Sequence, residues 1–214
     1  PRMAFLLALA ALCLLWWQLS HTRTGLRSVL WGAFAYWVVV TGWVVMNRKV
    51  SRPLIAASGL LAVSFAWLAL VRMRTGWEEG QLAVMYALLI VWLADSGAYF
   101  AGRRFGGAKL APAVSPGKTW AGLWGGLVVC ALLAVGVATW RGLPWLALLA
   151  VTCVVTLFSV VGDLNESLAK RYAGVKDSGS LIPGHGGVLD RFDSLLAAAP
   201  ILMLGVELVP ELHG

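Results

Sequence analysis

Long apolar runs alternate with short polar gaps along this chain. Each run is close to the about 20 residues that a helix needs to cross a bilayer core about 30 Å thick. Lipid cannot satisfy unpaired backbone groups, and none of the runs shows the alternation of a barrel strand. The pattern therefore predicts an all-α, polytopic bundle of about seven transmembrane helices, without strands. The runs are residues 3–19, 28–46, 53–71, 81–101, 119–140, 143–162 and 194–210.

The composition also indicates an integral membrane protein. Hydrophobic residues make up 60% of the 214 residues and charged residues 13%, which is unlike a soluble domain. The net charge of +7 lies in the gaps, so we interpret the basic residues as topology signals and anion-binding groups, not as a nucleic-acid surface. Cys13, Cys130 and Cys153 lie in apolar runs and form no metal or disulfide pattern. The first run lacks a cleavage site, so we expect an N-terminal piece before Pro1 and not a signal peptide.

The basic residues divide unequally between the two sides of the predicted bundle. With seven crossings, twelve of the seventeen Lys and Arg fall on one side, and the richer side is expected to face the cytoplasm. Polar loops at 102–118 and 163–193 both lie on that side and could build a common site. We therefore divide the chain into N-terminal transmembrane helices (1–80) and a catalytic transmembrane region (81–214).

The loop after the fourth run carries the first candidate residues. Asp95 lies six residues before the end of its run, about 9 Å below the helix end. A carboxylate at that depth indicates a functional site unless it pairs with a cation at the helix end. Further on, Lys109 and Lys118 occupy a glycine- and proline-rich loop, and Ser115 precedes a new helix whose N-terminus would favour phosphate. Anchoring of the helix ends is the alternative role of the lysines.

The segment from Ser159 to Asp193 holds five of the ten acidic residues. Asp163, Glu166 and Ser167 share one helical face, and Asp190 shares another with Asp193. Carboxylates interleaved with cations and glycine-rich backbone suit a divalent metal held against phosphates, because Mg²⁺ takes one or two carboxylates together with substrate oxygens. The surrounding cations and glycine-rich turn are Lys170, Arg171, Lys176, Arg191, His185, Gly186 and Gly187.

Other classes of function fit this segment less well. A zinc hydrolase would need more His or Cys ligands than His185 alone, and a serine hydrolase would need a G-x-S-x-G turn, which the chain lacks. A transporter of a phosphorylated solute would also place charges in the membrane, although it has no need of PGHGG followed by two aspartates. His185 is equally compatible with a structural hydrogen bond and with a direct substrate contact.

One string of residues has the order and spacing of a family signature. It comprises Ser167, Lys170, Arg171, Lys176, Asp177, Gly179, Pro183, Gly184, His185, Gly186, Gly187, Asp190, Arg191 and Asp193. This string resembles the signature of the phosphatidate cytidylyltransferases, the CDP-diacylglycerol synthases of membrane lipid synthesis. The segments LADSGAYFAGRRFG, KLAPAVSPGKTW and GDLNES are similar to that family as well. The chain departs from the family at Ala169, where a larger apolar residue is usual, and in its shorter N-terminal part.

The resemblance implies a reaction of CTP with phosphatidic acid that gives CDP-diacylglycerol and pyrophosphate. It also implies a homodimer in the inner membrane, with a cavity open to the cytoplasm. Asp163 and Asp190 would bind Mg²⁺, and a second cation such as K⁺ is an option. A CTP-dependent lipid kinase is the nearest rival. The catalytic set is then Asp163, Asp190, Lys118, Lys170, Arg171, Lys176 and Asp193, and the substrate-binding set is Ser115, Lys109, Ser167, His185, Gly186, Gly187, Arg191 and Asp95.

Overall fold

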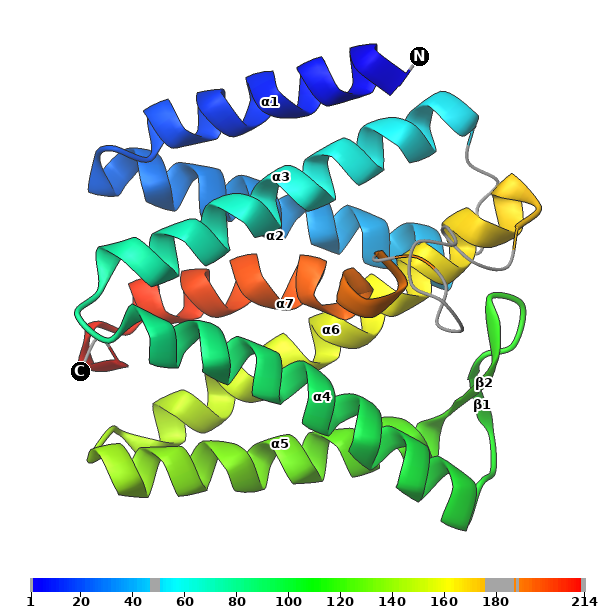
Figure 1. Cartoon of the computed structure of the whole chain (residues 1–214). Coiled ribbons are helices and arrows are strands. Elements are labelled where there is room, and N and C mark those ends of the chain that lie inside the picture. Colours follow the sequence, from blue (N-terminus) through cyan, green and yellow to red (C-terminus); the bar gives the residue numbers. More distant parts are fainter. Residues whose placement is uncertain (1, 47–50, 176–186, 188, 213–214) are drawn as a thin grey trace.

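The computed structural model describes residues 2–46, 51–175, 187 and 189–212. Within these residues the chain forms a bundle of seven long α-helices, with a small β-hairpin at one end (Figure 1). The elements are α1 (Arg2–Leu19), α2 (Arg23–Val45), α3 (Arg52–Gly76), α4 (Gly80–Phe105), β1 (Lys109–Ala111), β2 (Ser115–Thr119), α5 (Trp120–Arg141), α6 (Trp145–Ala173), α7 (Leu189–Leu208) and the 3₁₀ turn η1 (Pro210–Leu212).

Helix α7 runs through the middle of the bundle and contacts α2, α3, α4 and α6 (Figure 1). Its side chains from Ala197 to Leu204 are all buried, whereas α1 has no buried residue. Helices α1 to α6 are long and apolar enough to cross a membrane. The charged residues of α7 lie near its two ends, so its buried middle is apolar. The chain is therefore a multi-pass membrane protein whose core is organised around α7.

Each of the seven predicted runs coincides with a helix, which confirms the all-α bundle. The bounds of α6 differ from the prediction, because α6 continues past residue 162 to Ala173 and absorbs the first part of the expected loop. Contacts one turn apart support this polar extension: the Ser167 hydroxyl donates to Asp163 at 3.3 Å, and Lys170 pairs with Glu166 at 3.5 Å. Gly174, at φ 69°, then ends the helix in the left-handed conformation.

The expectation of a chain without strands was wrong in one place. Strands β1 and β2 pair antiparallel, with Lys109 opposite Thr119. The hairpin lies beyond the end of α4 and outside the apolar runs, so the requirement for helices in lipid does not apply to it. Gly106 and Gly107, at φ 58° and 88°, turn the chain out of α4 toward the hairpin.

Helices α4 and α5 approach each other backbone to backbone. A Cβ atom at Gly122 would lie 2.9 Å from the carbonyl oxygen of Ala98, and one at Gly126 would lie 2.9 Å from that of Ala94. The GxxxG formed by Gly122 and Gly126 is thus a helix-packing face. This contact holds Asp95, next to Ala94, close to the start of α5.

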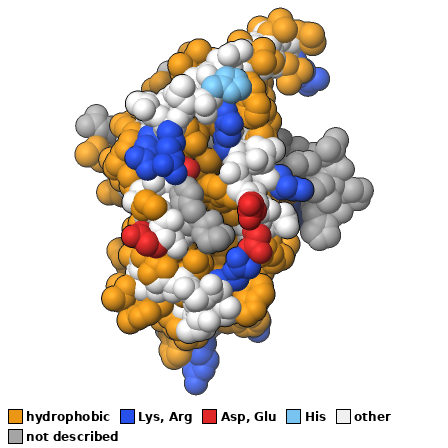
Figure 2. All heavy atoms as spheres, turned by 90° about the vertical axis from the view of Figure 1, so that its left-hand side faces the viewer, with side chains coloured by type: hydrophobic (Ala, Val, Ile, Leu, Met, Phe, Trp, Pro, Cys, Tyr) orange, Lys and Arg blue, Asp and Glu red, His pale blue; other side chains and the backbone are white. Residues whose placement is uncertain are grey.

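The end of the bundle away from the hairpin is also polar. Acidic and basic side chains gather on this face, with hydrophobic side chains around its edge (Figure 2). Arg141 at the end of α5 pairs there with Glu79, which precedes α4. Two polar ends with an apolar belt between them suit a protein that crosses a bilayer.

Candidate functional site

A cavity of about 440 Å³ lies between the end of α4, the hairpin, the start of α5 and α6. Its lining includes Asp95 of α4, Lys109 and Lys118 of the hairpin, and Asp163 of α6. The structure thus brings four predicted site residues together from two distant segments. In the described part of the chain Asp95 forms no ion pair of its own, so the simple pairing with a helix-end cation is not observed.

A lysine–aspartate pair joins the hairpin to α6 at this cavity. The ammonium of Lys118 lies 2.6 Å from the carboxylate of Asp163, and both side chains are about one-quarter exposed, at 22% and 28%. Thr119 follows directly and caps α5, because its hydroxyl accepts from the Gly122 amide at 3.1 Å. Lys118 therefore stands immediately before a helix N-terminus, which is the arrangement expected of a phosphate site.

A second lysine joins α6 to α7. The ammonium of Lys170 lies 2.8 Å from Asp190 and 3.5 Å from Glu166. Asp190 also accepts from the Gly187 amide at 2.7 Å, and its side chain is only 11% exposed. Gly187, shortly before α7, is thereby tied to the aspartate that was predicted to bind a metal.

Carboxylates outnumber lysines around the Lys118–Asp163 and Lys170–Asp190 pairs. Asp95 interacts electrostatically with Asp163 and Asp193, and Glu166 interacts with Asp193 and Asp190. Both carboxylate oxygens of Glu166 are buried without a hydrogen-bond partner among the described residues. If all were ionised, five carboxylates around Lys118 and Lys170 would leave a negative excess, which is costly in a partly buried site unless a bound proton or a cation neutralises it.

These donors fit Mg²⁺ as one part of a larger coordination shell. The described residues contain no group of three or more His, Cys, Asp or Glu side chains placed to hold a metal ion by themselves. Mg²⁺ does not require such a cage, since it is commonly held by one or two carboxylates plus phosphate oxygens and water. Asp163 and Asp190 supply hard oxygen atoms of this kind beside two lysines.

The remaining predicted residues lie on β2, on the last turn of α6 and at the start of α7, or outside the described residues. Arg171 and Arg191 are exposed on the last turn of α6 and the first turn of α7, and Ser115 begins β2 at the end away from the cavity. Asp193 accepts from the Ser194 amide at 2.6 Å. Lys176, His185 and Gly186 lie outside the described residues.

Sequence reasoning missed Arg103, which also lines the cavity. Its guanidinium donates to the hydroxyl of Tyr99 at 3.1 Å. Asp95, Tyr99 and Arg103 follow one another at four-residue spacing, so they lie along one face of α4. That spacing was the available signal, but Arg103 was interpreted only as a topology residue.

Comparison with known proteins identifies the family. The model of the cytidylyltransferase family matches residues 1–209. The chain belongs to the cytidylyltransferase family. It is 38% identical over 218 residues to the phosphatidate cytidylyltransferase of Brucella melitensis, a match that covers 88% of this chain and 77% of the relative.

Two further relatives with the same name are more similar over shorter stretches. The phosphatidate cytidylyltransferase of Pseudomonas aeruginosa is 45% identical over 146 residues, or 67% of this chain and 54% of the relative. That of Haemophilus influenzae is 51% identical over 130 residues, or 57% of this chain and 44% of the relative. The chain thus spans about half the length of these two cytidylyltransferases.

Proposed function

We propose that this chain is a phosphatidate cytidylyltransferase, a nucleotidyltransferase that transfers CMP from CTP to phosphatidic acid and yields CDP-diacylglycerol and pyrophosphate. The observation that carries the proposal is the presence of two lysine–carboxylate pairs, Lys118–Asp163 and Lys170–Asp190, at the same end of a membrane bundle. Membership in the cytidylyltransferase family and the shared name of the relatives support this choice of reaction.

The location suits one lipid substrate and one water-soluble substrate. The cavity beside Asp95 and Lys118 lies at the helix ends, where a headgroup in the membrane and a nucleotide in water can reach the same groups. Both substrates are anionic, and basic side chains at this end would attract both. CTP and phosphatidic acid are therefore the partners that we assign to the site.

The reaction is a displacement at phosphorus. An oxygen of the lipid phosphate attacks the α-phosphorus of CTP, the bond from that phosphorus to the bridging oxygen breaks, and pyrophosphate leaves with the electron pair. The lipid phosphate is already anionic near neutral pH, so no strong general base is required. The task of the protein is to position two anions and to neutralise their charge.

Asp163 and Asp190 would hold Mg²⁺, which would supply positive charge to neutralise the phosphates. Asp95, Glu166 and Asp193 surround these aspartates and would orient the ligands or hold a second cation such as K⁺. The Glu166 carboxylate is buried, and it has only the Lys170 ammonium at 3.5 Å to balance its charge, which is in keeping with a site that is completed by a cation.

The lysine and arginine side chains would bind the phosphates of CTP and phosphatidic acid. Lys118 stands at the N-terminus of α5, so its ammonium and the first amides of that helix can act on the same phosphate. Lys170 bridges α6 and α7 and can contact a phosphate while it remains near Asp190. The other cations assigned to this role are Arg171, Arg191, Lys109 and Lys176, with Ser115, Ser167, His185, Gly186 and Gly187 as further substrate contacts.

We further propose that the enzyme is a homodimer of the inner membrane whose cavity faces the cytoplasm. The side with more Lys and Arg is the one that carries the hairpin and the two lysine pairs, and the positive-inside rule assigns that side to the cytoplasm.

Product analysis tests the proposal against its rivals. Purified protein is incubated with CTP, phosphatidic acid and Mg²⁺, and the products are separated into lipid and aqueous fractions. The proposed reaction gives CDP-diacylglycerol and pyrophosphate, whereas a lipid kinase would give CDP and a phosphorylated lipid. A transporter would convert neither substrate. Either of the last two results contradicts the proposal.

A further inference from the structure

A second cavity, of about 240 Å³, lies on the side of α6 that faces away from Lys118 and Asp163. Asn165, Glu166, Ala169 and Tyr172 of α6 line it on that side. Helices α1, α2, α3 and α7 supply the rest of the wall, which is mainly apolar and includes Phe5, Trp43, Ile55, Gly59, Ala62 and Leu196. We call this space the α3–α6 cavity.

Glu166 connects the α3–α6 cavity to the Lys170–Asp190 pair. The Glu166 carboxylate belongs to the cavity wall and lies 3.5 Å from the Lys170 ammonium, which in turn lies 2.8 Å from Asp190. The charged side chains therefore lie at one border of the cavity, and the wall formed by α1 and α3 is mainly apolar. The Lys170 ammonium at that border can hold an anionic head once a cation neutralises Glu166 and Asp190, and the apolar wall can hold a hydrocarbon tail.

The size and lining of the cavity favour hydrocarbon over water. A buried water needs two to four polar partners, whereas apolar cavities of roughly 150 Å³ remain dry and bind small apolar molecules. The α3–α6 cavity is larger, and most of its lining side chains cannot hydrogen-bond. Asn165 and Glu166 form its polar edge next to Lys170. The glycerol part of a lipid would meet hydrogen-bond donors and acceptors there.

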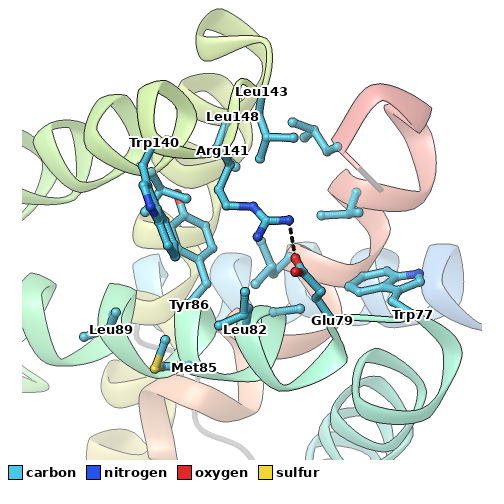
Figure 3. Close-up of a pocket in the computed structure, with 15 residues that line it drawn as sticks. Trp77, Glu79, Leu82, Met85, Tyr86, Leu89, Trp140, Arg141, Leu143 and Leu148 are labelled. Atoms are coloured by element: carbon cyan, nitrogen blue, oxygen red, sulfur yellow. Dashed lines mark ion pairs between the residues drawn. The ribbon is translucent and has the colours of Figure 1, made fainter. Parts of the chain in front are cut away.

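A contrasting cavity at the opposite end of the bundle lacks this connection. It measures about 190 Å³ and lies between the start of α4, the end of α5 and the C-terminal part of the chain. Figure 3 shows that Arg141 points across it at Glu79, with Tyr86, Met85 and Leu89 on the α4 side. Its cation is already paired and none of the predicted site residues lines it, so this cavity provides a matched control.

We propose that the α3–α6 cavity holds an acyl chain of the lipid substrate while the phosphate of that lipid lies at Lys170. This inference rests on the proposed function and extends it, because it assigns the α3–α6 cavity as the site that limits the length of the acyl chain. The lipid enters with its headgroup at the ends of α6 and α7, and its tail follows the apolar wall between α3 and α6.

Gly59 offers a position at which a larger side chain can be added to the lining of the cavity. A Cβ atom at Gly59 would meet nothing within 4 Å, and the residue lines the cavity. We expect Gly59→Leu to lower kcat/KM for long-chain phosphatidic acid roughly tenfold relative to a short-chain analogue, the effect of displacing about two methylene groups. The KM for CTP should not change. Ala83→Leu, which adds bulk to the contrasting cavity, should leave the chain-length preference unaltered.

Photocrosslinking tests the same site without requiring turnover. Phosphatidic acid with a diazirine in one acyl chain is placed in nanodiscs with the wild-type chain, and the labelled peptides are mapped by mass spectrometry. We expect labels within residues 55–63 of α3 and 165–172 of α6, reduced in Gly59→Leu and weak with phosphatidylcholine that carries the same diazirine. Equal labelling by both lipids, or labels confined to the outer faces of α4 and α5, would overturn the inference. Specific labelling of the cavity by a protein that makes no CDP-diacylglycerol would instead overturn the proposed function and leave the lipid site standing.

Discussion

Gly162 of α6 lies in direct contact with the backbone of Asp193 in α7. A Cβ atom at Gly162 would be 2.6 Å from the Asp193 carbonyl oxygen and 3.3 Å from the Cβ atom of Ala197. No side chain fits there, so the crossing of the two helices depends on this glycine. Asp163 is the next residue of α6, and the same crossing therefore sets its position relative to the carboxylates of α7.

The contact predicts a loss of both stability and activity in Gly162→Ala. The added methyl group must push α6 away from α7, and overpacking of this kind costs about 1–3 kcal/mol. The shift would also separate Asp163 from Asp193, so CMP transfer should fall strongly. Thermal unfolding in detergent and an activity assay measure the two effects. Gly136→Ala is the control, because a Cβ atom there meets nothing within 4 Å; equal behaviour of the two variants would show that the crossing is not tight.

Removal of either aspartate charge should stop the reaction without unfolding the protein. Asp163→Asn and Asp190→Asn keep the shape of the side chain but lose the negative charge that Lys118 and Lys170 now contact. We expect CMP transfer to fall at least about a hundredfold, because the phosphates would lose their metal-centred neutralisation. Glu78→Gln, an exposed change at the opposite end, should retain activity. Near-normal turnover in either aspartate variant would refute the metal assignment.

Lys118 should act on the nucleotide more than on the lipid. Its place before the N-terminus of α5 makes it a phosphate contact of the cavity that contains Asp95. We expect Lys118→Met to lower kcat/KM for CTP about a hundredfold, a size typical of losing one charged group that stabilises the transition state. Kinetics with CTP varied at fixed phosphatidic acid measure this, with exposed Arg74→Gln as the control. A defect confined to the KM for phosphatidic acid would contradict the assignment.

Removal of divalent metal should abolish activity reversibly. The excess of carboxylates over lysines at Asp163, Glu166 and Asp190 favours a bound cation, and Mg²⁺ or Mn²⁺ both accept such oxygen ligands. Excess EDTA should therefore reduce turnover to background, and added Mg²⁺ should restore it. Full activity in EDTA would show that the lysines and arginines suffice.

The orientation of the bundle can be tested by labelling from either side. In a cysteine-free background, Lys109→Cys in the hairpin should react with a membrane-impermeant maleimide from the cytoplasmic side only. Arg74→Cys, at the far end of α3, should react from the other side only. The reverse pattern would contradict the orientation that the basic residues predict.

The sequence predicts the helices well because the bilayer dictates their length. In an apolar run long enough to cross the bilayer, a helix is nearly the only structure that pairs all backbone N–H and C=O groups. All seven runs are helices in the structure. The polar ends were harder to predict. The strands of the hairpin are too short to show a pattern, and the extension of α6 to Ala173 depends on contacts such as that of Lys170 with Glu166.

The composition of the site was predictable, but its pairing was not. Charges gathered in two segments on one side of the bundle, which was enough to expect a common site. Which lysine meets which aspartate depends on helix crossings far apart in sequence, as for Lys118 with Asp163. Gly162 gave no signal in the sequence, since its role arises only where α7 passes over α6.

The most direct test of the account follows the label of [α-³²P]CTP in the purified chain. With phosphatidic acid and Mg²⁺ present, we predict that the label moves into the organic phase as CDP-diacylglycerol, while label from [γ-³²P]CTP stays in the aqueous phase as pyrophosphate. Transfer of the γ label to the lipid, or no transfer of either label by well-folded protein, would contradict the assignment of this chain as a cytidylyltransferase that acts on phosphatidic acid.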